Sequence, residues 1–286
     1  MPSLKELVTE ELSLPADARV SAMAEAIAAK HGAASRAVLF YGSCLRQQQL
    51  DGLILDFYLI VSGYRHAYQK RWLAIANRLV PPNVFYFEHD GLAAKYAVLS
   101  LDDFHRLNGP ETSSVSVWAR FAQPSRLVWV DPAVRNRIVD AVARAAPTLL
   151  AAAGRRDGES ALDWWRRAFA LTYSAELRAE RAGKGTSVVD TDIDRYEAFS
   201  GPAIAAIPER LSRGPSWASR RVRGKLLSVV RLAKASATFA GGADYIAWKI
   251  NRHAGTDIQL KAWQRRWPLL AAITLLPRLL RSGAVR

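Results

Sequence analysis

Short apolar runs and helical periodicity alternate along the first 130 residues of the chain. Four runs are rich in β-branched and aromatic residues and are bounded by turn residues, as strands are: 36–42 (RAVLFYG), 53–61 (LILDFYLIV), 83–87 (NVFYF) and 93–101 (AAKYAVLSL). Residues 15–30, which stop before Gly32, and residues 66–79 have the apolar spacing of helices. This alternation predicts a sheet flanked by helices.

The pattern becomes helical after RLVWVDP (126–132). Helical spacing covers residues 133–153, residues 161–181 and the chain from about 192 to its end, with breaks at 183–187 and 213–216. We therefore predict an α+β protein, with a mixed-sheet α/β domain over residues 1–132 and a mainly helical domain over residues 133–286. No repeat or low-complexity linker separates the two halves, so we expect them to pack together.

The chain has 286 residues, of which 50% are hydrophobic and 23% are charged. This composition is typical of a folded globular protein. The chain has one cysteine, Cys44, and its first residues lack the basic and then apolar pattern of a signal peptide, so we expect a reducing, cytoplasmic environment. No apolar run approaches the roughly 18 residues of a spanning helix, so we expect no membrane crossing.

Nearly all of the net charge of +14 lies in the last quarter of the chain. Residues 209–286 hold 16 Lys and Arg against 3 Asp and Glu. Such asymmetry indicates an anionic partner, either a phospholipid membrane or a nucleic acid. In residues 220–234 and 261–281 the basic side chains alternate with bulky aliphatic residues and Trp, which favours a membrane interface over nucleic acid. A core helix with solvated basic ends is the structural alternative.

One carboxylate interrupts the apolar run 53–61. Burying an ionised Asp56 in a strand is unfavourable by several kcal/mol unless it is paired or holds a metal. Tyr41, Gly42 and Ser43 end the preceding strand, and a strand, a Gly-Ser turn, a loop and an acid-bearing strand are the arrangement of the nucleotidyltransferase fold. There the turn amides and the Ser hydroxyl bind a triphosphate whose Mg²⁺ is held by carboxylates. An ordinary turn remains the structural alternative.

A second acid on the same face of this strand would stand at position 58, which is Tyr. Glu88, Asp90 or Glu176 would therefore have to supply a second carboxylate ligand. Phe57 and Leu59 are expected to face the core.

Several motifs, in order from about residue 38 to residue 180, resemble the mitochondrial-type CDP-diacylglycerol synthases, also called the translocator assembly and maintenance family, and their bacterial relatives. The motifs are Tyr41-Gly42-Ser43, Leu55-Asp56-Phe57, VFYFEHDGLAAKYAVLS with Lys95 and Tyr96, WARFAQPSRLVWV with Arg120 and Pro124, and LTYSAELR with Tyr173, Ser174, Glu176 and Arg178. Ala122 and Gln123 replace a Gln-Lys pair of the family. Beyond residue 180 the resemblance is thin, with Lys234 and Thr238 as its only matches.

The resemblance implies a Mg²⁺-dependent phosphatidate cytidylyltransferase, which makes CDP-diacylglycerol and pyrophosphate from CTP and phosphatidic acid. It implies nucleotide binding by Tyr41, Gly42, Ser43 and Arg120, catalysis by Asp56 and Lys95, metal binding by Asp56 and Glu176, and acceptor binding by Tyr173, Ser174 and Arg178. We expect such an enzyme to be peripheral, on the cytoplasmic face of the inner membrane, without a nucleic-acid partner.

The residues are consistent with this chemistry independently of any family. A phosphate monoester is mostly dianionic at neutral pH because its second pKa is about 6, so the site needs cations more than a base. Lys95 suits that role, although an edge-strand lysine reaching solvent would look the same. Arg120 and Arg178 are either phosphate ligands or parts of solvated helix faces. A transferase for a soluble or RNA acceptor, and a non-catalytic membrane or nucleic-acid adaptor, remain the alternative functions.

Overall fold

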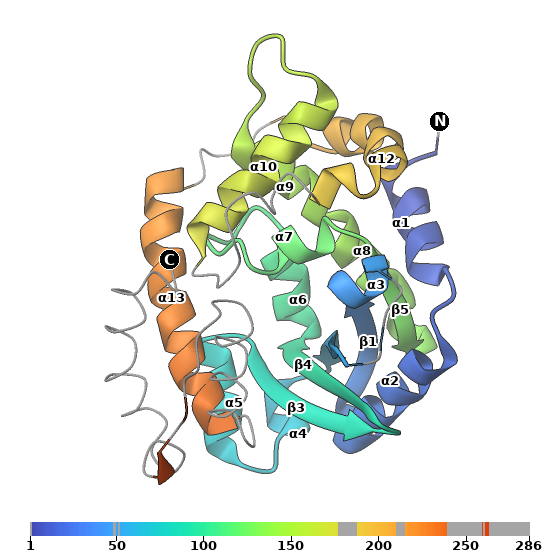
Figure 1. The fold of residues 1–286 in the computed structure, drawn as a ribbon, viewed down its shortest axis with the longest axis vertical. Helices are drawn as coiled ribbons and strands as arrows, with labels where there is room; N and C mark the ends of the chain where they lie inside the picture. Colours follow the sequence, from blue (N-terminus) through green and yellow to red (C-terminus); the bar gives the residue numbers. More distant parts are fainter. Residues whose placement is uncertain are drawn as a thin grey trace.

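The computed structural model of the protein describes residues 2–47, 50, 52–176, 188–209, 215–238, 259, 261 and 262. Five strands form one sheet in the order β3-β4-β2-β1-β5 (Figure 1). Their bounds are β1 Ser35–Tyr41, β2 Ile54–Val61, β3 Asn83–His89, β4 Leu92–Ser100 and β5 Ser125–Val130. The pair β2 and β4 is parallel and the other pairs are antiparallel. The predicted α+β class with a mixed sheet is confirmed.

Helices flank the sheet and make up most of the second half. They are α1 Leu4–Ser13, α2 Ala18–His31, α3 Ser43–Gln47, α4 Tyr64–Ala67, α5 Arg71–Leu79, α6 Leu101–Asn108, α7 Trp118–Phe121, α8 Arg135–Ala143, α9 Ala145–Ala153, α10 Ala161–Ala175, α12 Ile193–Ala205 and α13 Trp217–Thr238. Two short 3₁₀ helices cover Gly32–Ala34 and Pro132–Val134. The predicted helix over 66–79 is interrupted because Tyr68 adopts an extended backbone, which separates α4 from α5.

The sheet is buried on both faces, which explains why the 53–61 run is almost continuously apolar. Phe57 and Leu59 of β2 point into a core beneath α2, as predicted, together with Phe40 of β1. Their neighbours Tyr58 and Ile60 point to the opposite face, into a second and larger core. Asp56 follows the same alternation and is therefore on the face of the larger core.

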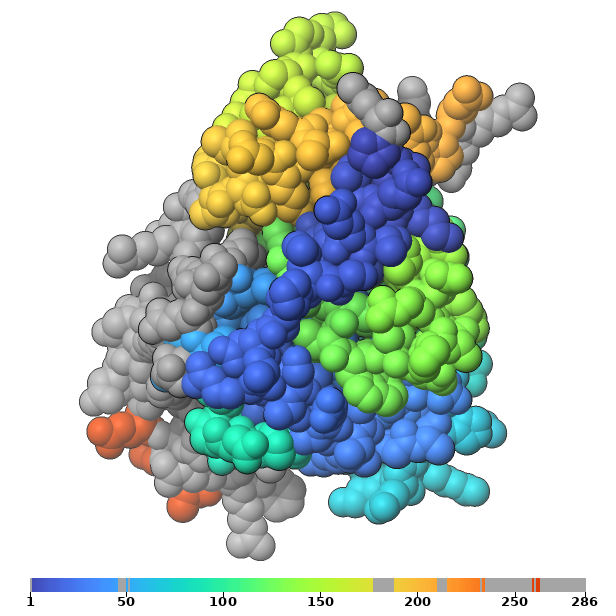
Figure 2. Space-filling model, turned by 90° about the vertical axis from the view of Figure 1, so that its right-hand side faces the viewer, coloured from blue at the N-terminus to red at the C-terminus, as the bar shows by residue number. Residues whose placement is uncertain are grey.

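That larger core joins the two halves of the chain. It includes Leu4 and Leu12 of α1, the sheet, and Trp165, Phe169 and Tyr196 of the helical half. Figure 2 shows the N-terminal residues, in dark blue, between α12, in yellow, and the green residues that follow the sheet. The expectation that the halves pack together is confirmed, and a domain boundary at residue 132 stays a prediction.

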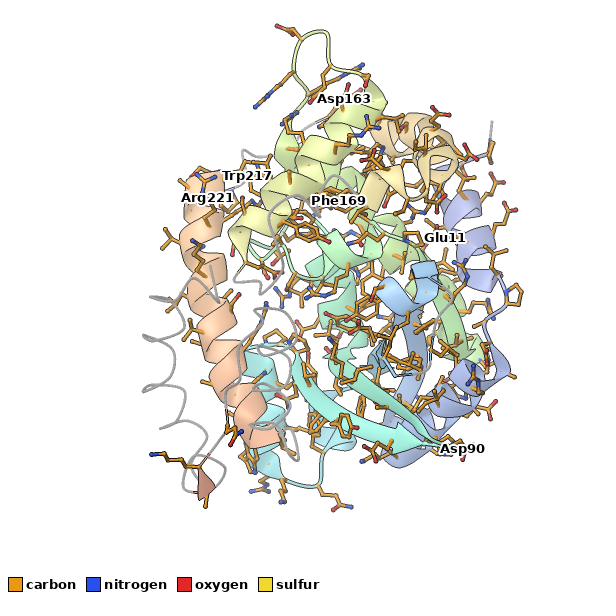
Figure 3. The ribbon with its side chains drawn as sticks, viewed as in Figure 1. Glu11, Asp90, Asp163, Phe169, Trp217 and Arg221 are labelled. Carbon is orange, nitrogen blue, oxygen red and sulfur yellow. The ribbon has the colours of Figure 1, made fainter. Side chains whose placement is uncertain are left out.

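An ion pair fastens α1 to α12 within this contact. Arg195 Nη2 donates to Glu11 Oε1 at 3.2 Å, and the side chains of both residues are 9% exposed. Figure 3 labels Glu11 on α1, facing the body of the molecule. The amide of Ser125, at the start of β5, also donates to Glu11, so the carboxylate connects three elements.

Within the described part of the chain, no helix combines the length and the apolar character of a membrane span. The predicted acceptor ligand Arg178 lies outside the described residues, as does nearly all of the predicted interfacial segment 261–281.

Candidate functional site

The turn after β1 lies directly against a carboxylate of the neighbouring strand. Gly42 has a φ of +96°, a conformation that side-chain-bearing residues rarely adopt. A Cβ built on Gly42 would lie only 2.9 Å from Asp56 Oδ2. Glycine at this position therefore allows both the turn and the close approach of the carboxylate. Ser43 follows at the start of α3, with an exposed side chain.

Asp56 is paired with Lys95 across two parallel strands. In the sheet register Asp56 lies between Tyr41 of β1 and Lys95 of β4. Lys95 Nζ lies 2.9 Å from Asp56 Oδ1, and the two side chains are 26% and 17% exposed. Since β4 has a neighbouring strand on each side, the edge-strand interpretation of Lys95 is wrong. The ion pair offsets the unfavourable free energy of burying the Lys95 and Asp56 charges, and both side chains keep some contact with solvent.

Arg120 of α7 adds a second cation to this face. Its guanidinium donates to the carbonyl oxygen of Ser116 in the turn before α7. Burial alone would lower the pKa of Arg120, but Tyr58, Glu176, Tyr41 and Asp56 surround it and raise that pKa above the ordinary arginine value. Arg120 is therefore a permanent positive charge among acidic and phenolic groups, and the alternative of a solvated helix face does not describe it.

The two phenols beside Arg120 stay neutral over the physiological range. Burial raises the pKa of Tyr41 well above its usual value, and the charge of Asp56 raises it further. Burial likewise raises the pKa of Tyr58. Both rings pack against Phe121 in tilted or edge-on arrangements, with the centroids of Tyr41 and Tyr58 5.3 Å apart. Neutral hydroxyls beside a carboxylate can donate hydrogen bonds without adding charge.

Helix α13 brings a third cation to the same region. Arg231 Nη1 lies 3.9 Å from Glu176 Oε1 and donates to Ser116 Oγ at 3.0 Å. Glu176, the C-cap of α10, is 9% exposed. A Cβ at Gly224 would collide with the carbonyl oxygen of Ala175, so glycine lets α13 approach the end of α10 closely enough for this contact.

Lys234 follows Arg231 by one helical turn on α13. Its ammonium donates to the carbonyl oxygen of Pro82 at 2.7 Å and to that of Val80. Burial, and secondarily the charge of Arg231, lower the pKa of Lys234 to about 7. A lysine in this state takes up a proton readily when an anion arrives beside it.

Together the described side chains make a region with more positive than negative charge. Lys95, Arg120 and Arg231 are cations and Lys234 is half protonated near pH 7, against the carboxylates of Asp56 and Glu176. An excess of fixed cations beside a glycine turn is what binding of a polyphosphate requires. The charges come from β2, β4, α7, α10 and α13, so the folded chain is needed to assemble them.

The donor set fits Mg²⁺ only when a phosphate ligand accompanies the ion. Among the described residues there is no group of three or more His, Cys, Asp or Glu side chains that could hold a metal by themselves. Mg²⁺ commonly takes one or two carboxylates and fills its other positions with phosphate oxygens and water. Asp56, partly exposed at the turn, fits the role of that carboxylate, whereas Glu176 faces Arg231.

The predicted acceptor residues occupy the end of α10. Tyr173 is half-buried and packs against the larger core. Ser174 is exposed, and its hydroxyl donates to the carbonyl oxygen of Leu171 at 2.7 Å within the helix. Both residues lie within one turn of Glu176, so the end of α10 is the part of the helix nearest the charged region.

The other carboxylates considered as metal ligands lie along the β3–β4 hairpin. Glu88 is exposed and accepts a hydrogen bond from the hydroxyl of Tyr86. Asp90, at the hairpin tip, has a side chain 74% exposed and lies 3.4 Å from His89 Nε2. Figure 3 shows Asp90 at the far end of the hairpin from α10, where Phe169 is labelled. Of the three predicted alternatives, Glu176 is the buried one.

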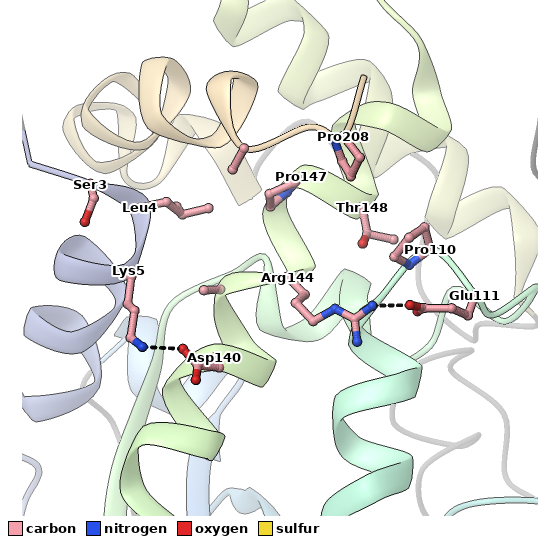
Figure 4. Close-up of a pocket in the computed structure, with 12 residues that line it drawn as sticks. Ser3, Leu4, Lys5, Pro110, Glu111, Asp140, Arg144, Pro147, Thr148 and Pro208 are labelled. Atoms are coloured by element: carbon pink, nitrogen blue, oxygen red, sulfur yellow. Dashed lines mark hydrogen bonds and ion pairs between the residues drawn. The ribbon is translucent and has the colours of Figure 1, made fainter. Parts of the chain in front are cut away.

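A pocket of about 540 Å³ lies elsewhere, among α1, α8, α9 and the residues after α12 (Figure 4). It is lined in part by Pro147, Thr148 and Arg144, and none of the predicted site residues borders it. The ion pair between Lys5 and Asp140 closes one side at 2.6 Å, and Arg144 pairs with Glu111 on the other. Its two cations are balanced by two carboxylates, whereas the region around Asp56 has an excess of positive charge, so the pocket offers less to an anion.

Arg231 was not among the residues predicted for the site. Residues 220–234 were interpreted as an interfacial segment on the basis of their composition alone. The spacing carries a further signal, because Arg220, Arg231 and Lys234 stand at i, i+11 and i+14 and so share one face of a helix. In the structure this face points inward, with Arg220 4% exposed and its guanidinium donating to the carbonyl oxygens of Thr112 and Ser113.

No family model matches the chain, and no curated protein matches it.

Proposed function

We propose that the protein is a Mg²⁺-dependent nucleotidyltransferase that moves a cytidylyl group from CTP to phosphatidic acid, yielding CDP-diacylglycerol and pyrophosphate. The observation that carries the proposal is the placement of Asp56 between the Gly42 turn and Lys95, with Arg120 on the same face. The resemblance of Tyr41-Gly42-Ser43 and Leu55-Asp56-Phe57 to the CDP-diacylglycerol synthases supports the choice of CTP and phosphatidate.

The reaction is a displacement at phosphorus that balances without a strong base. An oxygen of the phosphatidate monoester forms a bond to the α-phosphorus of CTP, and the bond from that phosphorus to the bridging oxygen of the β-phosphate breaks. The monoester is already deprotonated at neutral pH because its second pKa is about 6. Pyrophosphate leaves with the bonding electron pair, so the site has to stabilise negative charge and align two anions.

The cations of the site are arranged for those two tasks. Lys95 and Arg120 lie beside the turn and would hold the triphosphate and neutralise charge on the departing pyrophosphate. Arg231 and Lys234 approach from α13 and would meet the second anion, the phosphate of the acceptor. Tyr41 and Tyr58 would donate hydrogen bonds, since their phenols are neutral.

Asp56 would hold the Mg²⁺ that accompanies the triphosphate, and Glu176 would keep Arg231 in place. When bound, the ion would neutralise part of the negative charge of the phosphates, in addition to the cationic side chains. Because Lys95 pairs with Asp56 in the structure, binding would transfer Lys95 from the carboxylate to a phosphate oxygen.

The acceptor lipid defines where the enzyme would work. We propose a peripheral protein on the cytoplasmic face of the inner membrane, drawn there by the 16 Lys and Arg against 3 Asp and Glu in residues 209–286.

The test is formation of CDP-diacylglycerol by the purified protein from CTP labelled at the α-phosphate and vesicles containing phosphatidic acid, with Mg²⁺. Asp56→Asn keeps the shape of the side chain and should lower the rate by about 10²–10³, as removal of a charge-stabilising group does. Asp102→Asn is the matched control, because that side chain is 89% exposed on α6 and forms a surface ion pair with Arg137. Equal rates in the two variants, or labelling of a soluble acceptor in place of lipid, would contradict the proposal.

A further inference from the structure

Helix α5 buries one polar side chain, Asn77, and exposes three large apolar ones. Asn77 is fully buried, donates to the carbonyl oxygen of Val98 at 2.9 Å and accepts from the amide of Asn83. On the outward side Trp72 is 46% exposed, Ile75 60% and Leu79 74%. Their spacing of i, i+3 and i+7 places the three side chains on one face of the helix. A helix on a surface facing only water has the reverse arrangement.

Helix α13 repeats this reversal. Its inward face carries Arg220 and Arg231, whose guanidinium groups bind backbone carbonyl oxygens. Its outward face carries Val222, Leu226 and Val230, which are 71%, 64% and 39% exposed and stand four residues apart. The positive charges that the site uses are therefore turned into the protein, and the aliphatic side chains are turned out.

The two apolar stripes lie on adjoining elements. Arg231 Nε donates to the carbonyl oxygen of Pro81 at 3.0 Å, and Lys234 Nζ donates to that of Pro82, directly after the end of α5 at Leu79. Figure 1 shows α5, in cyan, beside the lower half of α13, in orange. Six of the eight exposed large apolar side chains of the described residues belong to these two helices. The remaining two are Leu14, the C-cap of α1, and Ile193, the first residue of α12.

Exposed cations border the stripes, and neither helix contains an acid. Arg71 and Arg78 are exposed on α5, and Arg221, Arg223 and Lys225 are exposed on α13. Figure 3 labels Arg221 near the start of α13. Aliphatic and Trp side chains next to Arg and Lys, with no carboxylate between them, complement an anionic phospholipid surface. A protein partner for so basic a face would need to be acidic and apolar at once.

We infer that α5 and α13 form one docking face, which inserts Trp72, Ile75, Leu79, Val222, Leu226 and Val230 into the interface of an anionic bilayer. The choice of a phospholipid surface rests on the proposed function, and the face itself rests on the exposed side chains. Since Arg231 and Lys234 of α13 point inward to the carbonyl oxygens of Pro81 and Pro82, a bilayer on this face would lie within one helix diameter of the cations assigned to the acceptor phosphate.

The experiment is flotation of the full chain with vesicles of phosphatidylcholine, with and without phosphatidylglycerol, which is not the proposed substrate. The variants are Ile75→Gln with Leu79→Gln, and Val222→Gln with Leu226→Gln. The matched control is Leu14→Gln with Ile193→Gln, which removes two exposed apolar side chains elsewhere. We expect binding to phosphatidylglycerol vesicles that each docking pair weakens by about tenfold or more and that the control leaves unchanged.

Unchanged binding by both docking pairs would overturn the inference. It would also be overturned if light scattering showed that these pairs convert an oligomer to a monomer, or if they lowered thermal stability more than the control without affecting flotation. In those cases the face would be covered by a second copy or by other residues of this chain.

Transferase activity toward short-chain, water-soluble phosphatidate separates this inference from the proposed function. The docking variants should retain that activity while losing flotation. Wild-type flotation without any cytidylyl transfer would contradict the function and leave the docking face intact.

Discussion

Substitution of Gly42 tests whether the turn and the carboxylate depend on each other. In Gly42→Ala the residue keeps a φ of +96°, which is unfavourable for a residue with a Cβ by about 1–2 kcal/mol. The new Cβ would also lie 2.9 Å from Asp56 Oδ2 and 3.3 Å from Asp56 Cβ. Overpacking of this kind typically destabilises a folded protein by about 1–3 kcal/mol. We therefore expect a total loss of about 2–5 kcal/mol in the free energy of unfolding.

Gly158→Ala provides the matched control, because Gly158 also has a positive φ, +70°, and a Cβ there would meet nothing within 4 Å. That variant should lose only the backbone contribution. In an Asp56→Ala background the collision with the carboxylate disappears, so Gly42→Ala should cost less there than in the wild type. Urea unfolding of the wild type, the three single variants and the double variant measures both differences.

The same substitution should disable the proposed chemistry. Displacing the Asp56 carboxylate from the turn should lower cytidylyl transfer by at least tenfold, while Gly158→Ala should keep the wild-type rate. The proposed role of Asp56 requires its carboxylate to lie against the Gly42 turn. Equal losses of stability in Gly42→Ala and Gly158→Ala, with full activity in Gly42→Ala, would refute it.

Two further predictions concern charges. Lys234, with a pKa lowered to about 7, is mostly neutral at pH 8 and mostly protonated at pH 6, so binding of short-chain phosphatidate, the proposed acceptor, should take up a proton at pH 8 and much less at pH 6. Calorimetry in Tris and HEPES measures this uptake, which Lys234→Gln should abolish; uptake that persists in the variant would assign it to another group. Glu11→Gln should lower the free energy of unfolding by about 3–5 kcal/mol because it leaves a buried Arg195 without its anion. Asp140→Asn, which breaks the exposed pair with Lys5, should change it by less than about 1 kcal/mol in urea unfolding, and equal losses would contradict this account.

Strands were the elements most fully predictable from the sequence. β1, β2, β3 and β4 all fall on predicted runs because each is apolar and bounded by turn residues. The unpredicted helices α1 and α6 are short, yet each has a local signal. Ser3 and Glu6 form a reciprocal capping box, and the Ser100 side chain accepts from the amide of Asp103. The start of α6 was not predicted because Leu101, its first residue, continues the apolar pattern of the predicted strand 93–101.

The site was predictable only in part, because a local sequence pattern can mark a residue but does not show which strand or helix packs beside it. An acid within an apolar strand indicated that Asp56 needs a partner, but the sequence does not show that β2 and β4 pair with Asp56 beside Lys95. Arg231 reaches Glu176 because Gly224 allows α13 to approach α10, a contact between residues 48 to 55 positions apart. Such a contact is determined by tertiary packing. The residue spacing along α13 therefore indicates which side chains share a face of the helix, but it does not show which residues that face contacts.

The most direct test of the account is a structure of the protein with CTP and Mg²⁺ bound. The account predicts the triphosphate against the Gly42–Ser43 turn, its oxygens within hydrogen-bond distance of Lys95 and Arg120, and Asp56 facing the phosphates. A nucleotide bound elsewhere, for example in the pocket among α1, α8 and α9, with Asp56 still engaged by Lys95, would contradict it.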